Sequence, residues 1–384
     1  MSVVEPPRVG LACNWGPDPR ATWSGTPFRL RTALEDRVDL VDLDVSPGAA
    51  ARFALKGSAV RRHDRGWISP WKHSGPGLRT LRRNLRRQVG TGRCDVVVEI
   101  GDLGAVDVPY LLVQDLSIRV LLDHYDEVSG VPHFPGMSRT ALQRRLDWQQ
   151  DVYAQAAGVV VMSQWLARQL MAEGLPGEKI FVANPGAVST IGAPRAVAAR
   201  PARQRTRLLL VGRDFHTKGG DVVLEALAIL RRDVDPDITL TVAGPPTWPL
   251  RGAPPKGVAF VGSVPPAEVV RLYDTHDLFV MPSRLEGFGI VFAEALSRGL
   301  PCVGRDAFAM PELIEPGKNG ALVGSLDPGE LAEAVAGALT DDDLYRECWA
   351  RRSAVADHFT WERMADDVLG AVDSVLSGDT AARS

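Results

Sequence analysis

The regular alternation of short apolar runs with helical or loop segments constrains the fold more than any other feature of this sequence. A first series of runs comprises Arg8–Asn14, Val38–Val45, Asp95–Ile100, Pro109–Val113, Gly158–Met162 and Ile180–Ala183. A second series comprises Arg207–Val211, Ile238–Ala243, Val258–Val261, Leu278–Met281 and Pro301–Val303. Parallel strands read as continuous apolar runs because helices cover both faces of their sheet. The alternation therefore predicts an α/β protein with two Rossmann-like domains.

The domain boundaries follow from the segment between the two series. Residues 186–205 are rich in Ala, Pro and Arg and show no useful periodicity. We predict a first domain over residues 1–190, a linker over 191–205, a second domain over 206–359, and a last helix and tail over 360–384. Ligands of open α/β sheets bind at the carboxyl ends of strands, so we expect a central cleft between the two domains to hold the site.

Composition excludes several classes of protein. The chain has 384 residues, of which 45% are apolar and 24% charged, with a formal net charge of −3. These values predict a soluble globular protein rather than a disordered or collagen-like one. The four cysteines form no C-x-x-C pair, which argues against a zinc ribbon and a disulfide framework. Without an apolar run of about 18 residues or a signal-peptide core at the start, a cytoplasmic location is expected.

Two cations follow the first strand of the second series. Gly212 and Arg213 come directly after Arg207–Val211, and Lys218 with Gly219 stands at the head of the next predicted helix. Side-chain charge beside the free N–H groups of a helix N-terminus makes an anion site, and the spacing is not that of a Walker A loop. Taken alone, such cations are more often simply solvated.

Two glutamates follow the strand Leu278–Met281. Glu286 lies in the loop with Gly287 and Gly289, which let a backbone approach a ligand. Glu294 lies eight residues further on, about 12 Å along a helix. One carboxylate can then reach a sugar ring and the other a ribose, with phosphates between them. The neighbours of Glu294 are apolar, so this acid needs a ligand or a partner.

With these motifs the sequence resembles the retaining GT-B glycosyltransferases of family GT4. The pattern is G-R-x4-K-G followed by E-x7-E with its Gly-Phe-Gly insert, and it continues through residues 295–301, 310–314, 317–320 and 359–361. The resemblance implies two Rossmann-like domains that face a central cleft. It implies that residues 1–190 bind the acceptor, that residues 206–359 bind the nucleotide-sugar, and that the amphipathic last helix crosses back to the first domain.

The resemblance also assigns roles to residues. Arg213 and Lys218 would hold the donor diphosphate, Glu286 would contact the transferred sugar, and Glu294 would bind the ribose hydroxyls. The residues implied in catalysis are Arg213, Lys218 and Glu286. The implied donor site comprises Gly25, Gly212, Arg213, Lys218, Glu286, Gly287, Phe288, Gly289, Ile290 and Glu294. The implied acceptor side comprises Trp23, Ser24 and Thr26.

One position departs from the family pattern. Many members carry a histidine at the carboxyl end of a first-domain strand that faces the donor sugar, but here Gln114 and Asp115 follow Pro109–Val113. Gln114 or Asp115 could fill that place, or His124 could fold back to it. A helix-capping role for Asp115 is the simpler alternative.

The implied reaction moves a hexose from a nucleotide-diphosphate sugar to an acceptor hydroxyl, in the biosynthesis of glycans, glycolipids or natural-product glycosides. The acceptor would be a saccharide, a lipid-linked molecule or a small molecule. We expect no metal, because no D-x-D pair stands in a suitable loop, and no cofactor beyond the nucleotide-sugar co-substrate. Arg213, Lys218 and helix N-termini would stabilise the charge of the departing diphosphate instead.

Residues 52–93 are the most polarised segment, with twelve basic residues and one acid, Asp64. One interpretation is peripheral contact with an anionic membrane at its inner face, supported by Trp67 and Trp71. The other is a helix that packs through Leu78, Leu81, Leu85 and Val89 with solvated arginines outside. Nucleic acid is not expected, because no reading helix or aromatic RNA motif accompanies the charge.

Three other functions compete with the transferase. A nucleotide-sugar 2-epimerase type of isomerase or hydrolase shares the architecture and would act on donor without acceptor. A dehydrogenase is weakly supported, because Gly16 and Gly25 after the first strand do not form G-x-G-x-x-G. The intact cations and glutamates argue against a non-catalytic sugar-nucleotide binding module.

Overall fold

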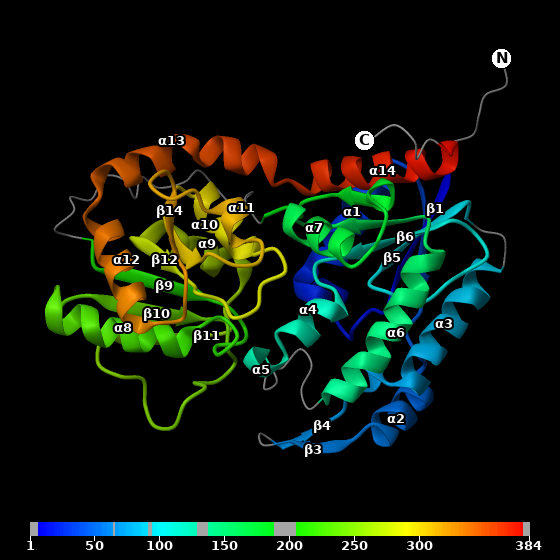
Figure 1. Cartoon of the computed structure of the whole chain (residues 1–384), viewed down its shortest axis with the longest axis horizontal. Helices are drawn as coiled ribbons and strands as arrows, with labels where there is room; N and C mark the ends of the chain where they lie inside the picture. Colours follow the sequence, from blue (N-terminus) through cyan, green and yellow to red (C-terminus); the bar gives the residue numbers. More distant parts are fainter. Residues whose placement is uncertain (1–6, 64–65, 91–93, 129–136, 188–204, 379–384) are drawn as a thin grey trace. The chain divides into compact units, whose positions relative to one another are not determined.

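The computed structural model describes residues 7–63, 66–90, 94–128, 137–187 and 205–378. The chain divides into two compact units, each with its own parallel sheet (Figure 1). Unit 1 comprises Met1–Pro185 together with Trp361–Ser384, and unit 2 comprises Gly186–Thr360. The linker expected over residues 191–205 lies, apart from Arg205, outside the described residues.

Unit 1 is built on a six-stranded parallel sheet of order β2-β1-β5-β6-β7-β8. Its strands are β1 (Arg8–Cys13), β2 (Asp39–Asp44), β5 (Val96–Ile100), β6 (Tyr110–Gln114), β7 (Gly158–Val161) and β8 (Ile180–Val182). Its helices are η1 (Pro19–Gly25), α1 (Thr26–Glu35), α2 (Ala49–Ser58), η2 (Trp71–His73), α3 (Gly75–Val89), α4 (Ile118–Asp123), α5 (Tyr125–Val128), α6 (Arg139–Gln155), α7 (Gln164–Ala172), η3 (Gly177–Lys179) and α14 (Trp361–Ser377). All six apolar runs of the first series are strands of this sheet.

The last helix, α14, belongs to unit 1, as the family resemblance implies. Its buried stripe of Met364, Val368 and Val372 packs on α1 and on the β7–β8 edge of the sheet. Arg37 forms an ion pair of 3.0 Å (Nε–Oδ1) with Asp366 at the rim of this contact. A helix of 17 residues with one apolar face needs such a partner surface, since its own hydrogen bonds supply little net stability.

Unit 2 has a second six-stranded parallel sheet, of order β11-β10-β9-β12-β13-β14. Its strands are β9 (Arg207–Val211), β10 (Thr239–Ala243), β11 (Val258–Gly262), β12 (Leu278–Val280), β13 (Cys302–Arg305) and β14 (Gly320–Val323). Its helices are α8 (Gly220–Asp233), α9 (Pro266–Thr275), α10 (Ile290–Ser297), α11 (Met310–Leu313), α12 (Pro328–Thr340) and α13 (Asp342–His358). This is the strand order 3-2-1-4-5-6 of a doubly wound fold, in which the direction of winding reverses between β9 and β12.

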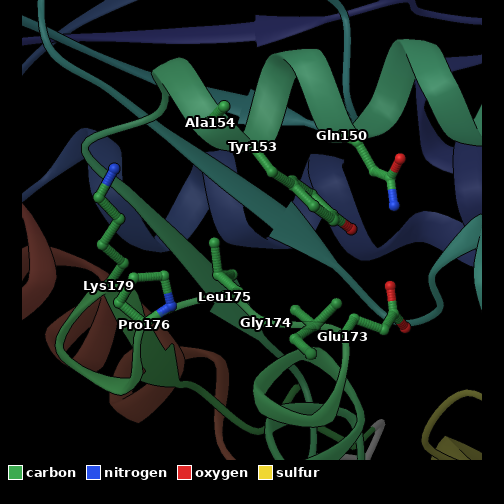
Figure 2. A pocket seen from close by; sticks show the side chains of 9 residues that line it. Gln150, Tyr153, Ala154, Glu173, Gly174, Leu175, Pro176 and Lys179 are labelled. Atoms are coloured by element: carbon green, nitrogen blue, oxygen red, sulfur yellow. The ribbon is translucent and has the colours of Figure 1, made fainter.

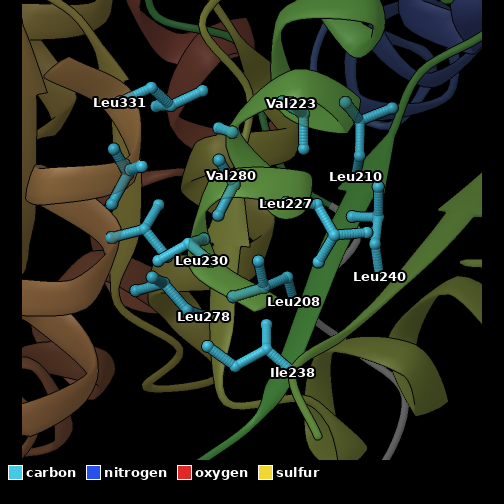
Figure 3. Packing of buried hydrophobic residues seen from close by; sticks show 14 of the residues in the cluster. Leu208, Leu210, Val223, Leu227, Leu230, Ile238, Leu240, Leu278, Val280 and Leu331 are labelled. Atoms are coloured by element: carbon cyan, nitrogen blue, oxygen red, sulfur yellow. The ribbon is translucent and has the colours of Figure 1, made fainter. Parts of the chain in front are cut away.

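The core of unit 2 explains why its strands read as continuous apolar runs. Leu208 and Leu210 of β9 pack with Val280 of β12 against Val223 of α8 and Leu331 of α12 (Figure 3). All five side chains are almost fully buried. Side chains that face the opposite side of the sheet, such as Leu209 and Phe279, are equally buried, so no position along these strands can be polar without cost.

Two pieces of sheet were not predicted. Strand β14 completes the sheet of unit 2 beside β13. A short antiparallel hairpin in unit 1 pairs β3 (Arg61–His63) with β4 (Gly66–Ile68). Helix α3 follows the second interpretation of the basic segment, because Leu78, Leu81, Leu85 and Val89 are all buried.

Within the described part of the chain, no helix is both long enough and apolar enough to cross a membrane. The cysteines form no disulfide: Cys13, Cys94, Cys302 and Cys348 are all buried free thiols. Burial raises the pKa of Cys13 to about 12, so this thiol stays protonated at neutral pH.

Glu99 of β5 is a fully buried carboxyl group. Its Oε2 accepts hydrogen bonds from the backbone N–H groups of Leu103 (3.0 Å) and Gly104 (3.2 Å). Burial raises its pKa well above the usual 4.5, although these two hydrogen bonds act in the opposite direction. The folded protein therefore keeps this proton above the pH at which the unfolded chain releases it.

The sign of this effect is testable. A carboxyl group with a raised pKa in the folded state makes the free energy of unfolding fall as pH rises above about 4.5, by up to about 1.4 kcal/mol per pH unit. We expect Glu99→Gln to remove this contribution. Urea unfolding at about pH 5 and about pH 8 should show a smaller loss of stability in the variant than in the wild type. The exposed Glu178→Gln serves as control, and equal slopes in Glu99→Gln and wild type would contradict the assignment.

Candidate active site

The two sequence motifs meet at the switch point of unit 2. The loop with Lys218 follows β9, and the loop with Glu286 follows β12, the strand paired directly with β9. Because both strands are parallel, both loops emerge at the carboxyl edge of the sheet. Ligands of open α/β sheets bind in the crevice at this reversal of winding.

Glycines shape the first loop. A Cβ on Gly212 would lie 2.6 Å from Cγ of Lys218, so only glycine lets the lysine stem lie against the end of β9. Gly219 has φ +73°, and a Cβ there would meet the carbonyl oxygen of Pro282 at 2.4 Å. The loop is closed by a hydrogen bond of 3.0 Å from the Lys218 N–H to the Asp214 carbonyl. Gly219 then begins α8 as its N-cap.

Lys218 and Glu286 are in direct contact. Nζ of Lys218 lies 2.6 Å from Oε2 of Glu286, and the side chains are only 21% and 10% exposed. The hydroxyl of Ser283 donates a hydrogen bond of 3.2 Å to the same carboxylate oxygen. The structure thus brings together the predicted diphosphate-binding cation and the predicted sugar-binding acid.

Arg213 has a different environment. It is exposed, and no ion pair among the described residues includes it. The two predicted cations therefore differ: Lys218 is held in place by Glu286, whereas Arg213 projects from the end of β9 into solvent.

A salt bridge that the sequence did not predict joins the two loops. Arg284 makes a two-pronged ion pair with Asp221 of α8, at 2.7 and 2.8 Å. The Arg284 N–H also donates to the Thr217 carbonyl at 2.8 Å. Burial alone would raise the pKa of Asp221, but the hydrogen bond and charge of Arg284 outweigh it and lower the pKa. Asp221 therefore stays ionised at neutral pH and anchors the loop after β12 to the start of α8.

Glu294 has the partner that its apolar surroundings require. It is half-buried on α10 and accepts a hydrogen bond of 3.0 Å from the hydroxyl of Tyr273 on α9. Burial, together with the charge of Glu294, raises the pKa of Tyr273 well above its usual value. Tyr273 therefore remains a donor at all physiological pH values and orients the Glu294 carboxylate.

The turn between the two glutamates is buried. Gly289 has φ +93° and begins α10 as its N-cap, ahead of Ile290. Phe288 is 4% exposed and packs edge-on against Phe359, with ring centroids 5.7 Å apart. Gly287 is also buried. The packed aromatic ring fixes the turn that presents the backbone N–H groups of the helix start.

The predicted acceptor-side residues lie in a strained turn of unit 1. Trp23 (φ 47°), Ser24 (φ 58°) and Gly25 (φ 88°) are three successive left-handed residues, and Gly25 begins α1. Left-handed backbone is uncommon for residues other than glycine and usually marks a constrained segment. Thr26 is buried directly after this turn.

Three residues were predicted as alternatives to the histidine of the family: Gln114, Asp115 and His124. The structure places them in different environments. Gln114 is 3% exposed and accepts a hydrogen bond from the Tyr153 hydroxyl, so its side chain is part of a buried network. Asp115 is half-buried after β6, but Ser117 and not Asp115 caps α4, with the Val120 N–H donating to its hydroxyl. Nδ1 of His124 lies 3.3 Å from Oε1 of Glu127 at the end of α4.

Unit 1 also contains a pocket of about 380 Å³ between α6 and the segment after α7. Figure 2 shows the tips of Gln150, Tyr153 and Glu173 gathered on one side of it. Ser117 donates a hydrogen bond of 2.8 Å to Glu173, whose pKa is raised by burial. Tyr153 and Glu173 bond to Gln114 and Ser117 of unit 1. None of the predicted site residues lines this pocket, so it is separate from the motifs.

The described residues include no group of three or more His, Cys, Asp or Glu side chains that could hold a metal ion. The cationic side chains in the loops after β9 and β12 are Arg213, Lys218 and Arg284, of which Lys218 pairs with Glu286 and Arg284 with Asp221.

The fold of this chain is the GT-B fold, as its solved structural neighbours show. The sucrose-phosphate synthase of Thermosynechococcus elongatus superposes with a TM-score of 0.71 and 18% identity, over 97% of this chain and 100% of that one. The structure of Anabaena Alr3699/HepE in complex with UDP and glucose superposes with a TM-score of 0.63 and 16% identity, over 96% and 100%.

Sequence comparison finds similarity over the second half of the chain. Residues 198–352 match the family described as glycosyl transferases group 1. The D-inositol 3-phosphate glycosyltransferase of Nocardia farcinica is 28% identical over 247 residues, which are 59% of this chain and 55% of that protein. The chain thus spans about half the length of the curated relatives it matches. The matched residues 198–352 lie within unit 2.

Proposed function

We propose that this protein is a retaining glycosyltransferase that moves a hexose from a nucleotide-diphosphate sugar to an acceptor hydroxyl without a metal ion. The observation that carries the proposal is the ion pair of Lys218 and Glu286 at the switch point of a group 1 glycosyltransferase domain. Its relatives include a D-inositol 3-phosphate glycosyltransferase and its structural neighbours include a complex with UDP and glucose, which supports this class of reaction.

The proposed chemistry is governed by charge on the leaving group. The bond from the anomeric carbon to the diphosphate breaks, and a bond to the acceptor oxygen forms on the same face of the sugar. The proton of the acceptor hydroxyl passes to the leaving phosphate oxygen. The ammonium of Lys218 has three N–H donors, so it can bind a diphosphate oxygen while it still contacts Glu286. Arg213 and the N-termini of α8 and α10 add positive potential in the same place.

The two glutamates have separate roles in this proposal. Glu286, held by Lys218 and Ser283, accepts hydrogen bonds from hydroxyls of the transferred sugar. Glu294, oriented by Tyr273, accepts hydrogen bonds from the ribose of the donor. A carboxylate whose position is fixed by a second group loses less conformational freedom when it binds a diol.

The test uses a panel of UDP-, GDP-, ADP- and dTDP-sugars. The matching donor should raise the melting temperature, because a ligand at 100 times its dissociation constant adds about 2.7 kcal/mol to the stability of the folded protein. With an acceptor present, the donor should be consumed and a glycoside formed, and EDTA should leave the rate almost unchanged.

Each alternative predicts a different outcome. Conversion of the donor without any acceptor, as a 2-epimerase type of isomerase or hydrolase requires, would contradict the transferase. Inverted anomeric configuration in the product, detected by NMR, would contradict retention. Loss of activity in EDTA with recovery on added Mg²⁺ would contradict metal independence.

A further inference from the structure

Unit 1 exposes two large aromatic side chains close together in sequence. Phe53 on α2 is 81% exposed and Trp67 on β4 is 75% exposed. They are the only exposed Phe, Tyr or Trp side chains in the described part of the chain. Trp71, which the sequence grouped with Trp67, is instead buried at 5% exposure. Exposing Phe53 and Trp67 has a cost in water that packing within unit 1 does not offset, so a binding role is favoured.

Local structure fixes Phe53 on the outer side of its helix. Helix α2 buries a single residue, Leu55, which packs with Ala59 and Trp71 in a small separate cluster. Phe53 lies two residues before Leu55, which is about 200° around a helix, so the two side chains point in opposite directions. The helix is thus attached by Leu55 and presents Phe53 to solvent.

The β3–β4 hairpin lies beside α2 at one end of unit 1 (Figure 1). The hydroxyl of Ser69, directly after β4, donates a hydrogen bond of 2.7 Å to the Lys56 carbonyl on α2. Within the hairpin, Trp67 is paired directly opposite Arg62, which is also exposed. We call the exposed Phe53, Lys56, Val60, Arg62 and Trp67, together with the half-buried Arg52, the aromatic–basic surface.

The charges of this surface have one sign. None of the ion pairs formed by the described residues includes Arg52, Lys56 or Arg62. Arg52 and Lys56 lie four residues apart on α2, so they share one face of that helix. Burial lowers the pKa of Lys72, and repulsion from Lys56 and Arg52 lowers it further. Arg79, Arg83 and Arg87 continue the positive charge along the exposed side of α3.

We propose that the aromatic–basic surface docks unit 1 on the surface of an anionic lipid bilayer. Trp and Phe side chains favour the boundary between headgroups and acyl chains, and Lys and Arg around them are attracted to acidic headgroups. The apolar part of this contact is Phe53, Val60 and Trp67, since the leucines of α3 are used inside unit 1. The proposal is independent of the transfer reaction, and its test requires no activity.

The experiment is co-sedimentation of the full chain with vesicles of phosphatidylcholine, with or without phosphatidylglycerol. We expect binding only to the anionic vesicles, and weaker binding at about 0.5 M than at about 0.05 M NaCl because salt screens the attraction. Phe53→Ser with Trp67→Ser should weaken binding at least about 10-fold through loss of apolar burial. Lys56→Gln with Arg62→Gln should weaken it about 30-fold.

Matched control variants distinguish binding through this surface from nonspecific adsorption to vesicles. Met171→Ser removes another exposed apolar side chain of unit 1, and Arg144→Gln with Arg251→Gln removes two exposed charges elsewhere. Neither should change binding. Brominated phosphatidylglycerol should quench the tryptophan fluorescence of the wild type more than that of a Trp67→Leu variant, because Trp67 is the only tryptophan that enters the bilayer in this proposal.

Three outcomes would overturn the proposal. The first is no binding to anionic vesicles at low salt. The second is binding that the charge variants weaken but the aromatic variants leave unchanged, which would mean adsorption without insertion. The third is dimerisation in solution that Phe53→Ser with Trp67→Ser abolishes, combined with no vesicle binding, which would make this surface a protein interface.

Discussion

Lys218→Ala is expected to lower kcat/KM by about 10²–10³ with any donor that the wild type accepts. Loss of one well-placed group that stabilises charge in a transition state typically costs about 3–4 kcal/mol. Lys218 is such a group in the proposed reaction, because its ammonium is mostly buried, lies 2.6 Å from Glu286 and is held against the end of β9 by Gly212. The rate should be measured with saturating acceptor, and melting curves should show that the variant folds.

The control for this variant is Lys256→Ala, which removes an exposed lysine elsewhere in unit 2 and should leave kcat/KM unchanged. Glu286→Gln should also lose turnover, since its amide no longer binds the lysine as an ion pair. If Lys218→Ala keeps full activity while folded, the diphosphate is held elsewhere and the site assignment is wrong. If the wild type turns over no nucleotide-sugar at all, the proposed function itself is wrong. That outcome is distinguishable from a wrong site assignment, in which the wild type is active and Lys218→Ala is equally active.

Arg145→Ala is expected to lower the free energy of unfolding of unit 1 by about 3–5 kcal/mol. Arg145 on α6 forms a two-pronged ion pair with Asp102, one arm of which measures 2.6 Å, and the side chains are 6% and 9% exposed. Gln149 donates a further hydrogen bond of 3.0 Å to the same carboxylate. Removing the arginine leaves a buried carboxylate without its counter-charge, which costs far more than the pair itself contributes.

A matched control lies on the same helix. Arg139 pairs with Asp126 at 2.9 Å, but both side chains are exposed, so Arg139→Ala should cost no more than about 1 kcal/mol. Urea unfolding followed by tryptophan fluorescence would measure both variants. Adding Asp102→Ala to Arg145→Ala should recover part of the loss, because the unpaired charge is then gone. Equal losses for Arg145→Ala and Arg139→Ala would contradict this account.

The sheets could be predicted from the sequence because buried parallel strands have a distinctive pattern. Runs such as Arg207–Val211 are apolar throughout, since helices cover both faces. Strand β14 was missed because Gly320–Val323 begins with glycine and follows a turn of polar residues. The β3–β4 hairpin was missed because its basic residues show no apolar alternation.

The site could be predicted in part. The family resemblance implied that Lys218 and Glu286 bind one donor. Their direct ion pair depends on the pairing of β9 with β12, which joins residues 68 positions apart in the sequence. Tyr273, which orients Glu294, carried no signal, because a lone tyrosine on an amphipathic helix is indistinguishable from a core residue. The Arg284–Asp221 pair was hidden for a similar reason, as surface charges are common at such positions.

The two-part make-up of unit 1 has a consequence for how the chain matures on the ribosome. Unit 1 needs α14, yet α14 is translated only after the whole of Gly186–Thr360. Unit 2 is a continuous segment of the chain, so it can fold before α14 is translated. Until then, the apolar surface of α1 and of the β7–β8 edge, which α14 covers in the folded protein, is exposed to solvent. During that interval the N-terminal half is the part of the chain most prone to aggregation. A stop codon placed just before Trp361 should yield a truncated protein that aggregates although its unit 2 is folded.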